Sequence, residues 1–410
     1  MSTSNTVAII GAGLSGLALA LSLHQQGISS TLYESRPAPL DIGGAIMLSP
    51  NALRVLDQLG IYKRMLPLAY NFHTLHFYKD DGKPLDTFEF GVQKKHGYDA
   101  MRIYRFELIN LLLEALTEAG IKPIYGKKFI RVTEENEQGV TWEFEDGTTS
   151  TAYLLIGADG IHSRVRSYIA PKANPLFVNM IGVSASIPAS QLGPVEEDGF
   201  AMPLTIMNKT RGAFVAAPQR KDGSEIFIGR PSRLASEPDR EELERMTKDK
   251  SWAVEFLREG LDDYPPIVGR AMSNIPLERV NLWPFYVIPK LESWMSPQGR
   301  VIILGDAAHA LPPTAGQGIN QAFEDIYTFS RVLSGIQQRQ GDAEDTKSTL
   351  RAWQHERQER VDGILELNGK IDKRRLPAQV GETEAEVEAF DLEWLYNVDF
   401  DETVNRILSN

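Results

Sequence analysis

The clearest pattern of hydrophobic and polar positions lies at the start of the chain. Residues 6–10 form a short, mostly β-branched apolar run, which is typical of a buried strand. From Leu14 to Gln26 the apolar residues follow helical spacing, and Gly27 ends that helix. Residues 30–34 return to a strand pattern. The sequence therefore predicts a strand, a helix and a second strand in immediate succession.

The middle of the chain is dominated by strand patterns with turn residues between them. The elements expected there are a hairpin of 72–78 and 84–90, a helix at 107–119, a three-stranded meander of 129–133, 140–145 and 148–155, a hairpin of 212–218 and 225–229, and a charged helix that runs from 239 through 248 to about 260. Residues 176 to 275 are rich in strands, so we expect them to build most of a second lobe.

The last strongly periodic unit is a strand at 300–304, a loop at 305–318 and a helix that follows it. Its apolar residues at helical spacing are Ile319, Ala322, Phe323, Ile326, Phe329, Val332 and Leu333. After about residue 336 the chain is polar and helical, and the charged residues 337–349 are expected to form a solvated loop.

Composition narrows the functional classes. The 410 residues are 42% hydrophobic and 24% charged, as in ordinary globular proteins. Lys and Arg number 43 against 55 Asp and Glu, a net charge of −12, which argues against a general grip on nucleic acid or anionic lipid. There is no cysteine, so disulfides, thiolate metal sites and cysteine nucleophiles are excluded, and redox chemistry requires a bound cofactor.

Nothing in the sequence indicates export or membrane insertion. The first residues lack the basic and apolar regions of a signal peptide. No apolar run reaches the roughly 18 residues of a membrane span. We therefore expect a cytoplasmic protein without an integral membrane segment.

The segment between the first strand and helix contains the sequence Gly11-Ala12-Gly13-Leu14-Ser15-Gly16. In this context Gly11 permits a tight turn, Gly13 lets the main chain approach a pyrophosphate, and Gly16 lets helix and strand pack closely. Glu34, at the end of the second strand, would accept ribose hydroxyls. The sequence thus predicts a dinucleotide-binding unit.

Two further motifs accompany this unit: Leu155-Ile156-Gly157-Ala158-Asp159-Gly160-Ile161-His162-Ser163-Arg164-Val165-Arg166, and the run from Gly305-Asp306-Ala307-Ala308-His309 to Gly316-Gln317-Gly318-Ile319-Asn320. Together the three motifs resemble the single-component FAD-dependent aromatic hydroxylase family (group A flavoprotein monooxygenases). Segments 43–53 and 104–108 also resemble that family, and Glu393-Trp394-Leu395-Tyr396 is similar to its fungal salicylate-hydroxylase-like branch.

The resemblance implies an α/β fold like that of para-hydroxybenzoate hydroxylase, in which a Rossmann-type FAD-binding domain carries an inserted β-sheet-rich substrate domain and C-terminal helices. The expected division is an FAD-binding domain of 1–71, 99–175 and 276–335, a substrate domain of 72–98 and 176–275, and a C-terminal helical region of 336–410. The implied activity is an NAD(P)H- and O2-dependent monooxygenase that oxidises an aromatic or polycyclic small molecule through a flavin C4a-hydroperoxide, in secondary metabolism.

The resemblance also assigns residues to the cofactor. Those expected to bind FAD are Gly11, Gly13, Gly16, Glu34, Arg36, Ala45, Arg105, Asp159, Asp306, Gly318 and Ile319. Ala45 and Ile319 match family positions that touch the cofactor through the main chain, and Arg105 would pair with its phosphates. Pro312, Pro313, Gly316 and Gly318 belong to a loop beside the flavin. We identify no catalytic base and no metal ligand, and His309 is expected to serve the loop rather than the chemistry.

The substrate lobe departs from one family pattern. The Arg and Tyr that activate a phenol in some fungal members would fall near Val183-Ser184 and Ala217, which are unsuitable for that role. An apolar pocket is predicted instead, and its candidate residues are Met202, Met207, Phe214, Phe227, Trp283, Phe285 and Tyr286.

Several alternatives stay open at the level of sequence. The chain could be a flavin-dependent halogenase, a nicotinamide dehydrogenase or a catalytically silent flavin-binding protein. The reductant is either NADPH or NADH, bound only transiently, because a second strand–GxGxxG–helix unit is missing from the sequence. The expected partners are the small-molecule substrate and O2, and the protein is expected to be a monomer or a homodimer.

Overall fold

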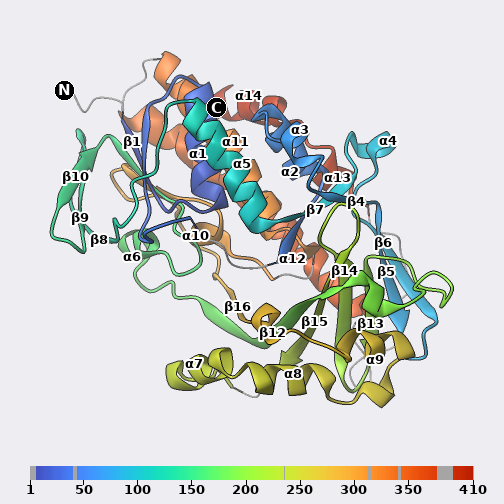
Figure 1. Ribbon diagram of the computed structural model, residues 1–410. Coiled ribbons are helices and arrows are strands. Elements are labelled where there is room, and N and C mark those ends of the chain that lie inside the picture. Colours follow the sequence, from blue (N-terminus) through green and yellow to red (C-terminus); the bar gives the residue numbers. More distant parts are fainter. Residues whose placement is uncertain are drawn as a thin grey trace.

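The computed structural model describes residues 6–39, 44–234, 236–312, 315–339, 343–375 and 391–409. These residues form two lobes (Figure 1). In one, helices surround a small parallel sheet, and in the other, helices cover one face of a large sheet. Within the described ranges no helix is long and apolar enough to cross a membrane.

The small parallel sheet has four strands in the order β17-β11-β1-β2. They are β17 (Val301–Ile303), β11 (Leu154–Gly157), β1 (Val7–Ile10) and β2 (Ser30–Tyr33). Helix α1 (Leu14–Gln25) connects β1 to β2. Every residue of β1 and β11 is buried, because a parallel sheet is covered on both faces. The predicted strand–helix–strand unit is confirmed.

Two three-stranded sheets flank this unit. One is a meander of β8 (Phe129–Asn136), β9 (Gly139–Phe144) and β10 (Thr149–Ala152); the other joins β3 (Ala45–Leu48), β7 (Ala100–Tyr104) and β4 (Tyr70–Phe72). The single strand expected at 148–155 was wrong: β10 ends at Ala152, and β11 starts at Leu154 in the parallel sheet. The reason is that the segment changes from alternating polar residues to a fully buried apolar run.

The large sheet has seven strands in the order β16-β12-β15-β14-β13-β5-β6. They are β16 (Asn281–Val287), β12 (Leu176–Pro188), β15 (Glu225–Arg233), β14 (Gly212–Pro218), β13 (Leu204–Asn208), β5 (Thr74–Lys79) and β6 (Pro84–Glu89). The hairpin expected around residues 80–83 therefore adds its strands to the second lobe. Strand β16 pairs with β12, so this sheet extends beyond residue 275, where we expected the lobe to end.

Helices α7 (Arg240–Lys248), α8 (Lys250–Arg258) and α9 (Pro266–Met272) lie along one side of the large sheet (Figure 1). The continuous helix expected from 239 to 260 is divided in two. Asp249 causes the break, because its side chain accepts a hydrogen bond from the Trp252 N–H and caps the start of α8.

The C-terminal part is built from α11 (Gly318–Arg339), α12 (Ala343–Arg375), α13 (Glu393–Tyr396) and α14 (Phe400–Ser409). The solvated loop expected at 337–349 was wrong for the described residues, because α11 and α12 continue into this segment. Glu344 lies within ion-pair distance of Lys347 and Arg351 on the same helical side, so these charges support a helix.

The remaining described elements are short or lie outside the sheets. They are α2 (Pro50–Gln58), α3 (Tyr62–Met65), α4 (Gln93–His96), α5 (Arg105–Glu118), α6 (Arg164–Ile169), α10 (Asp306–His309), and the 3-10 turns η1 (Ala189–Leu192), η2 (Leu261–Asp263) and η3 (Leu277–Arg279). Helix α5 agrees with the helix expected at 107–119.

Candidate active site

The turn between β1 and α1 brings main chain against main chain. Gly11 has a φ of +105°, and a Cβ there would lie 2.5 Å from the carbonyl oxygen of Ala158. A Cβ on Gly16 would lie 1.8 Å from the carbonyl oxygen of Gly11, so neither position accepts a side chain. An added Cβ on Gly13 meets none of the described atoms within 4 Å. Gly13 precedes α1 as its N-cap and no side chain caps the helix, so the first amide groups of α1 suit an anion.

Glu34 organises the same turn from the end of β2. It is 5% exposed, and its Oε2 accepts a hydrogen bond from the Ala12 N–H at 2.9 Å. Its Oε1 accepts from the Arg36 N–H at 2.9 Å and from the Ser35 hydroxyl at 3.1 Å. A carboxylate offers about four acceptor positions, so Glu34 retains one, on Oε2. The Arg36 guanidinium lies 3.6 Å from Oε1 and is mostly exposed.

Asp306 and Arg105 come from distant segments and influence each other electrostatically. Asp306 begins α10 and Arg105 begins α5, and solvent reaches both residues. Protein nevertheless surrounds them closely: desolvation raises the pKa of Asp306 and lowers the pKa of Arg105, and the charge of each opposes the shift of the other. The pair therefore lines a recess of the protein and presents one negative and one positive group there.

One carboxylate oxygen of Asp159 accepts hydrogen bonds from the protein, and the other has no partner among the described residues. Its Oδ2 accepts hydrogen bonds from the N–H groups of Arg164 at 2.8 Å and Val165 at 3.3 Å, at the start of α6. Its Oδ1 is buried and has no hydrogen-bond partner among the described residues. Burial accordingly raises the pKa of Asp159. An unpartnered buried oxygen of this kind is a candidate ligand contact.

Arg166, from the same motif, has a structural position. Its guanidinium donates to the carbonyl oxygens of Ile161 at 2.7 Å, Ala173 at 3.0 Å and Ala307 at 3.1 Å. The contact with Ala307 ties α6 to the segment that carries Asp306. The Asp159 and Asp306 motifs are therefore held together through one side chain.

The loop expected beside the flavin lies against β3. Pro312 is half-buried, whereas Pro313 is outside the described residues. Gly316 has a φ of +64°, and a Cβ there would lie 3.2 Å from the Met47 Cε. Gly318 begins α11, and Ile319 is half-buried behind it.

Asn320 fixes this loop to β3. Its Nδ2 donates to the carbonyl oxygens of Gly316 at 2.7 Å and Met47 at 3.3 Å, and its Oδ1 accepts from the Ser49 N–H at 3.0 Å. One buried amide thus positions both segments that the resemblance places next to the cofactor ring.

The main-chain N–H and carbonyl oxygen of Ala45, which were expected to contact the cofactor, are both hydrogen-bonded to side chains. Its N–H donates to the Oε1 of Gln219 at 2.9 Å, and its carbonyl oxygen accepts from the Arg102 Nη2 at 3.3 Å. Arg102 also donates through Nε to the carbonyl oxygen of Pro218 at 2.8 Å, and burial lowers its pKa to about 10. The main chain of Ala45 is therefore held by two side chains in this structure, where the sequence predicted a cofactor contact.

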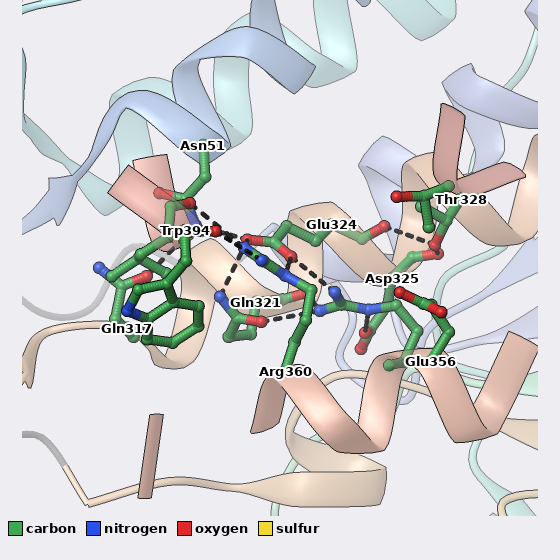
Figure 2. A network of polar contacts seen from close by, with 12 residues as sticks. Asn51, Gln317, Gln321, Glu324, Asp325, Thr328, Glu356, Arg360 and Trp394 are labelled. Carbon is green, nitrogen blue, oxygen red and sulfur yellow. Dashed lines mark hydrogen bonds and ion pairs between the residues drawn. The ribbon is translucent and has the colours of Figure 1, made fainter. Parts of the chain in front are cut away.

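A buried network of charges lies behind the Asp306 segment (Figure 2). Arg357, from α12, donates through Nε to the Asp325 Oδ1 at 2.7 Å and through Nη1 to the Glu324 Oε2 at 2.5 Å. Arg360 also donates to Glu324, at 2.5 and 2.8 Å, and Asn51 donates to Glu324 at 2.7 Å. Figure 2 shows Asn51 of α2 and Arg360 of α12 pointing toward Glu324 of α11.

The network reaches the cofactor segment through Asp325. Its Oδ2 accepts from the Gly305 N–H at 2.9 Å and lies 2.6 Å from the Nε2 of His309. Burial alone would raise the pKa of Asp325, but His309 and Arg357 outweigh this and lower it. Asp325 thus holds the buried His309 side chain at the end of α10. The sequence motifs gave no signal for Asp325, Arg357, Gln219 or Arg102, apart from the isolated charge at Arg102 within an apolar strand pattern.

The large sheet presents small residues on the face opposite α8 and α9. In β12, Gly182 and Ser184 alternate with Ile181 and Val183, which belong to the core under these helices. Ser184 lies opposite Gly229, Gly229 opposite Val215, and Val215 opposite Thr205, so these four positions share a face.

Two aromatic rings flank this row. A Cβ on Gly229 would lie 3.0 Å from the ring of Phe227, and a Cβ on Gly182 would lie 3.0 Å from the ring of Phe285. A Cβ on Gly44, next to β3, would lie 3.5 Å from Phe227. The face therefore turns toward β3, and we call it the cofactor-side face, defined by Gly182, Ser184, Phe227, Gly229 and Phe285.

Some expected pocket residues lie elsewhere. Phe214 is fully buried in the core between the sheet and its helices, and Met202 packs against the same core, so both expectations were wrong. The reason is strand alternation, which sequence hydrophobicity alone does not orient. Met207, by contrast, is two residues from Thr205 on β13 and opposite Ala213, so it lies on the same face as the row of small residues, as expected for a pocket residue. The Tyr286 hydroxyl donates to Glu237, at the sheet edge near α7.

The chemistry of these residues fits FAD. The free amide groups above Gly13 suit a pyrophosphate, the remaining acceptor of Glu34 suits a hydroxyl, and the unpartnered Asp159 Oδ1 and the Asp306–Arg105 pair offer further polar contacts. Only Ala45 departs from this fit, because its N–H is already bonded to Gln219.

Comparisons with known proteins agree with this site. A family model described as FAD binding domain matches residues 4–367. The chain is 28% identical over 347 residues to hispidin-3-hydroxylase of Neonothopanus nambi, covering 80% of each protein. It is 28% identical to salicylate hydroxylase of Pseudomonas putida, covering 97% of this chain and 93% of that protein.

The fold is also similar to that of solved structures. Klebsiella pneumoniae HpxO complexed with FAD and uric acid superposes with a TM-score of 0.77 at 22% identity, covering 100% of this chain and 97% of that one. The family model and the curated relatives confirm the interpretation of the sequence as a flavin-dependent monooxygenase at the level of class. Since the family model covers residues 4–367 of 410, the chain belongs to the FAD binding domain family and is an FAD-dependent aromatic hydroxylase.

Proposed function

We propose that this enzyme uses NAD(P)H and O2 to oxidise an aromatic or polycyclic small molecule that binds against the cofactor-side face. The observation that supports the proposal is the closeness of Phe227 to Gly44: a Cβ added to Gly44 would lie 3.5 Å from the Phe227 ring, so that face lies next to the strand adjoining the expected flavin position. FAD, when bound, supplies the reducing and oxygen-activating chemistry. The chain binds and orients the reactants and excludes water from them.

For the cofactor, we propose that the amide groups near Gly13 bind the pyrophosphate, with Gly11 and Gly16 shaping the turn. Glu34, with Arg36 beside it, accepts a ribose hydroxyl on Oε2. Asp306 contacts the chain that links the flavin ring to the phosphates, Arg105 beside it pairs with the phosphates, and the Asp159 Oδ1 accepts a further hydrogen bond. Gly316, Gly318 and Ile319, held by Asn320, border the ring.

For the substrate, we propose a flat ring system. Gly182, Ser184 and Gly229 leave room above the sheet, and Phe227 and Phe285 offer ring faces on either side. Aromatic side chains contact planar ligands through stacking or edge-to-face packing. We propose no side chain as catalytic base.

We also propose that the substrate domain comprises 72–98 and 176–275 together with strand β16, while the other segments form the FAD-binding domain and the C-terminal helical region of 336–410. In this proposal the enzyme acts as a cytoplasmic monomer or homodimer in secondary metabolism.

The decisive test is anaerobic stopped-flow reduction of the bound FAD by NADPH, and separately by NADH. Each is measured alone and with salicylate, hispidin, indole and tetracycline. The expected result is that one compound class speeds bleaching of the flavin many-fold. Oxygenated product from that compound in air would complete the assignment. Bound FAD that neither nicotinamide reduces, with any of these compounds, would count against the proposal.

A further inference from the structure

Gln219 connects the two lobes at the position where the cofactor ring is expected. It follows β14 of the large sheet and is fully buried. Its Oε1 accepts from the Ala45 N–H at 2.9 Å, and its Nε2 donates to the Ser186 hydroxyl at 2.7 Å and to the Tyr104 hydroxyl at 2.9 Å. A Cβ on Gly44 would lie only 2.6 Å from the same Oε1, so glycine there lets Gln219 approach.

The Ala45 N–H has room for one good acceptor. A main-chain amide donates a single hydrogen, so a cofactor ring and Gln219 cannot both accept it with full strength. The carbonyl oxygen of Ala45 differs, because it has two lone pairs and the bond from Arg102 leaves one of them available. The conflict is therefore confined to the N–H and to Gln219.

We propose that Gln219 is a displaceable hydrogen-bond partner of the Ala45 main chain. Gln219, from the substrate lobe, and the FAD ring compete for the Ala45 N–H on strand β3. This inference rests on the proposed function, since contact of Ala45 with FAD is implied by family resemblance. Gln219 satisfies the amide when the ring is absent, and it must release Ala45 when the ring binds there. Ser186, which accepts a hydrogen bond from Gln219, lies on β12 two residues from Ser184. Gln219 is therefore hydrogen-bonded to a residue beside the cofactor-side face.

If Gln219 competes with FAD, removing its acceptor should tighten FAD binding. A purely structural role of Gln219 does not predict tighter binding. In Gln219→Leu the acceptor is lost and the Ala45 N–H is free for FAD. The FAD dissociation constant, measured by fluorescence titration of the full-length FAD-free protein, should fall by about threefold to tenfold, the equivalent of one net hydrogen bond. The melting temperature of the FAD-free variant should fall at the same time, because Tyr104 and Ser186 lose their partner.

Two variants serve as controls. Gln219→Glu keeps an acceptor for the Ala45 N–H, so it should not gain affinity for FAD. Gln191→Leu removes a comparable side chain, whose Nε2 donates to the carbonyl oxygens of Arg270 at 3.1 Å and Ala271 at 2.8 Å in the second lobe. It should lower the melting temperature and leave the FAD dissociation constant unchanged.

Hydrogen exchange of a peptide that contains Ala45 gives a readout independent of affinity. In the FAD-free state its amide should exchange faster in Gln219→Leu than in the wild type, and FAD should restore protection to both. Weaker or unchanged FAD binding in Gln219→Leu, or an amide that stays protected without FAD, would overturn the inference. A wild-type protein that fails to bind FAD would instead contradict the proposed function.

Discussion

Gly13 and Gly16 lie in the same turn, but a methyl group would meet different surroundings at each. At Gly16 it would lie 1.8 Å from a main-chain oxygen, whereas at Gly13 it would meet no described atom within 4 Å. Gly16 is therefore required by the fold itself, whereas Gly13 is required only if a ligand occupies the space beside it.

This contrast leads to a paired prediction. Gly13→Ala should change the free energy of unfolding of the FAD-free protein by no more than about 0.5 kcal/mol, while FAD retention after gel filtration should drop at least severalfold. Gly16→Ala should lose both stability and FAD. Urea unfolding and the flavin-to-protein absorbance ratio measure the two effects. Full FAD retention in Gly13→Ala would show that the pyrophosphate does not bind next to Gly13.

Asp306, a residue expected to bind the cofactor, carries a cost of ionisation in the folded protein. Desolvation raises its pKa above the ordinary value of an aspartate, so the ionised form is disfavoured in the folded FAD-free protein. The sign for stability follows: the penalty is present above the raised pKa and is relieved as pH falls through it.

Asp306→Asn should therefore raise the melting temperature of the FAD-free protein at pH 7 and reduce the gain that the wild type shows on acidification. The same variant should retain FAD more weakly, because it loses a charged acceptor. Thermal melts from pH 5 to 8, with and without FAD, test both statements. A variant that melts lower than the wild type without FAD would contradict the pKa argument.

At the scale of a single strand, the two faces of β12 have different surroundings. Val183 is fully buried in the core beneath α8 and α9, whereas its neighbour Gly182 lies beneath the ring of Phe285. The two adjacent residues therefore lie on opposite faces of the strand: Val183 contributes to the core, and Gly182 lies on the face that we propose binds the substrate.

Gly182→Val should push the Phe285 ring and raise the KM of whichever compound stimulates flavin reduction by roughly tenfold, a value in the range expected for one misfitted methyl-sized group. FAD content should not change. Val183→Ala should instead cost about 2 kcal/mol in urea unfolding and leave KM as it is. The reverse pattern would mean that the two faces are assigned incorrectly.

At the scale of the whole molecule, the C-terminal helices complete the interior behind the Asp306 segment. Arg357 and Arg360 of α12 offset Glu324 and Asp325 of α11, and Asp325 holds the Gly305 N–H. Burial opposes ionisation of Glu324, but Arg360 and Arg357 outweigh it and lower its pKa. The stabilising contribution of these carboxylates is present above their unfolded pKa of about 4 and is lost as pH falls below it.

Arg357→Met should therefore destabilise the protein by about 3–5 kcal/mol at pH 7, since it leaves buried carboxylates without their partner. The loss should shrink toward pH 4. Arg230 is a matched control, because it is also buried but donates to the carbonyl oxygens of Phe256, Leu257 and Glu259. Arg230→Met should show no comparable dependence on pH. Urea unfolding at both pH values compares them, and equal pH profiles would contradict the ion-network account.

The sequence by itself determined the nucleotide-binding unit and the class of enzyme. Gly11, Gly13, Gly16 and Glu34 lie within one strand–helix–strand segment, where short-range spacing fixes turn, helix and strand together. The Asp159 and Asp306 motifs are equally local, because each lies where a buried strand meets the start of a helix. Patterns of this kind need no knowledge of distant contacts.

Only the tertiary structure decided what holds these segments and which strand faces meet. Gln219 bonds to Ala45 across 174 residues, and Arg102 bonds to Pro218 across 116. Phe214 and Phe227 have the same side chain on neighbouring strands, yet one is core and the other adjoins β3. The physical reason is that periodicity shows only that a strand has two faces. Packing against helices on one side of the large sheet and against the lobe with the small parallel sheet on the other decides which face becomes core.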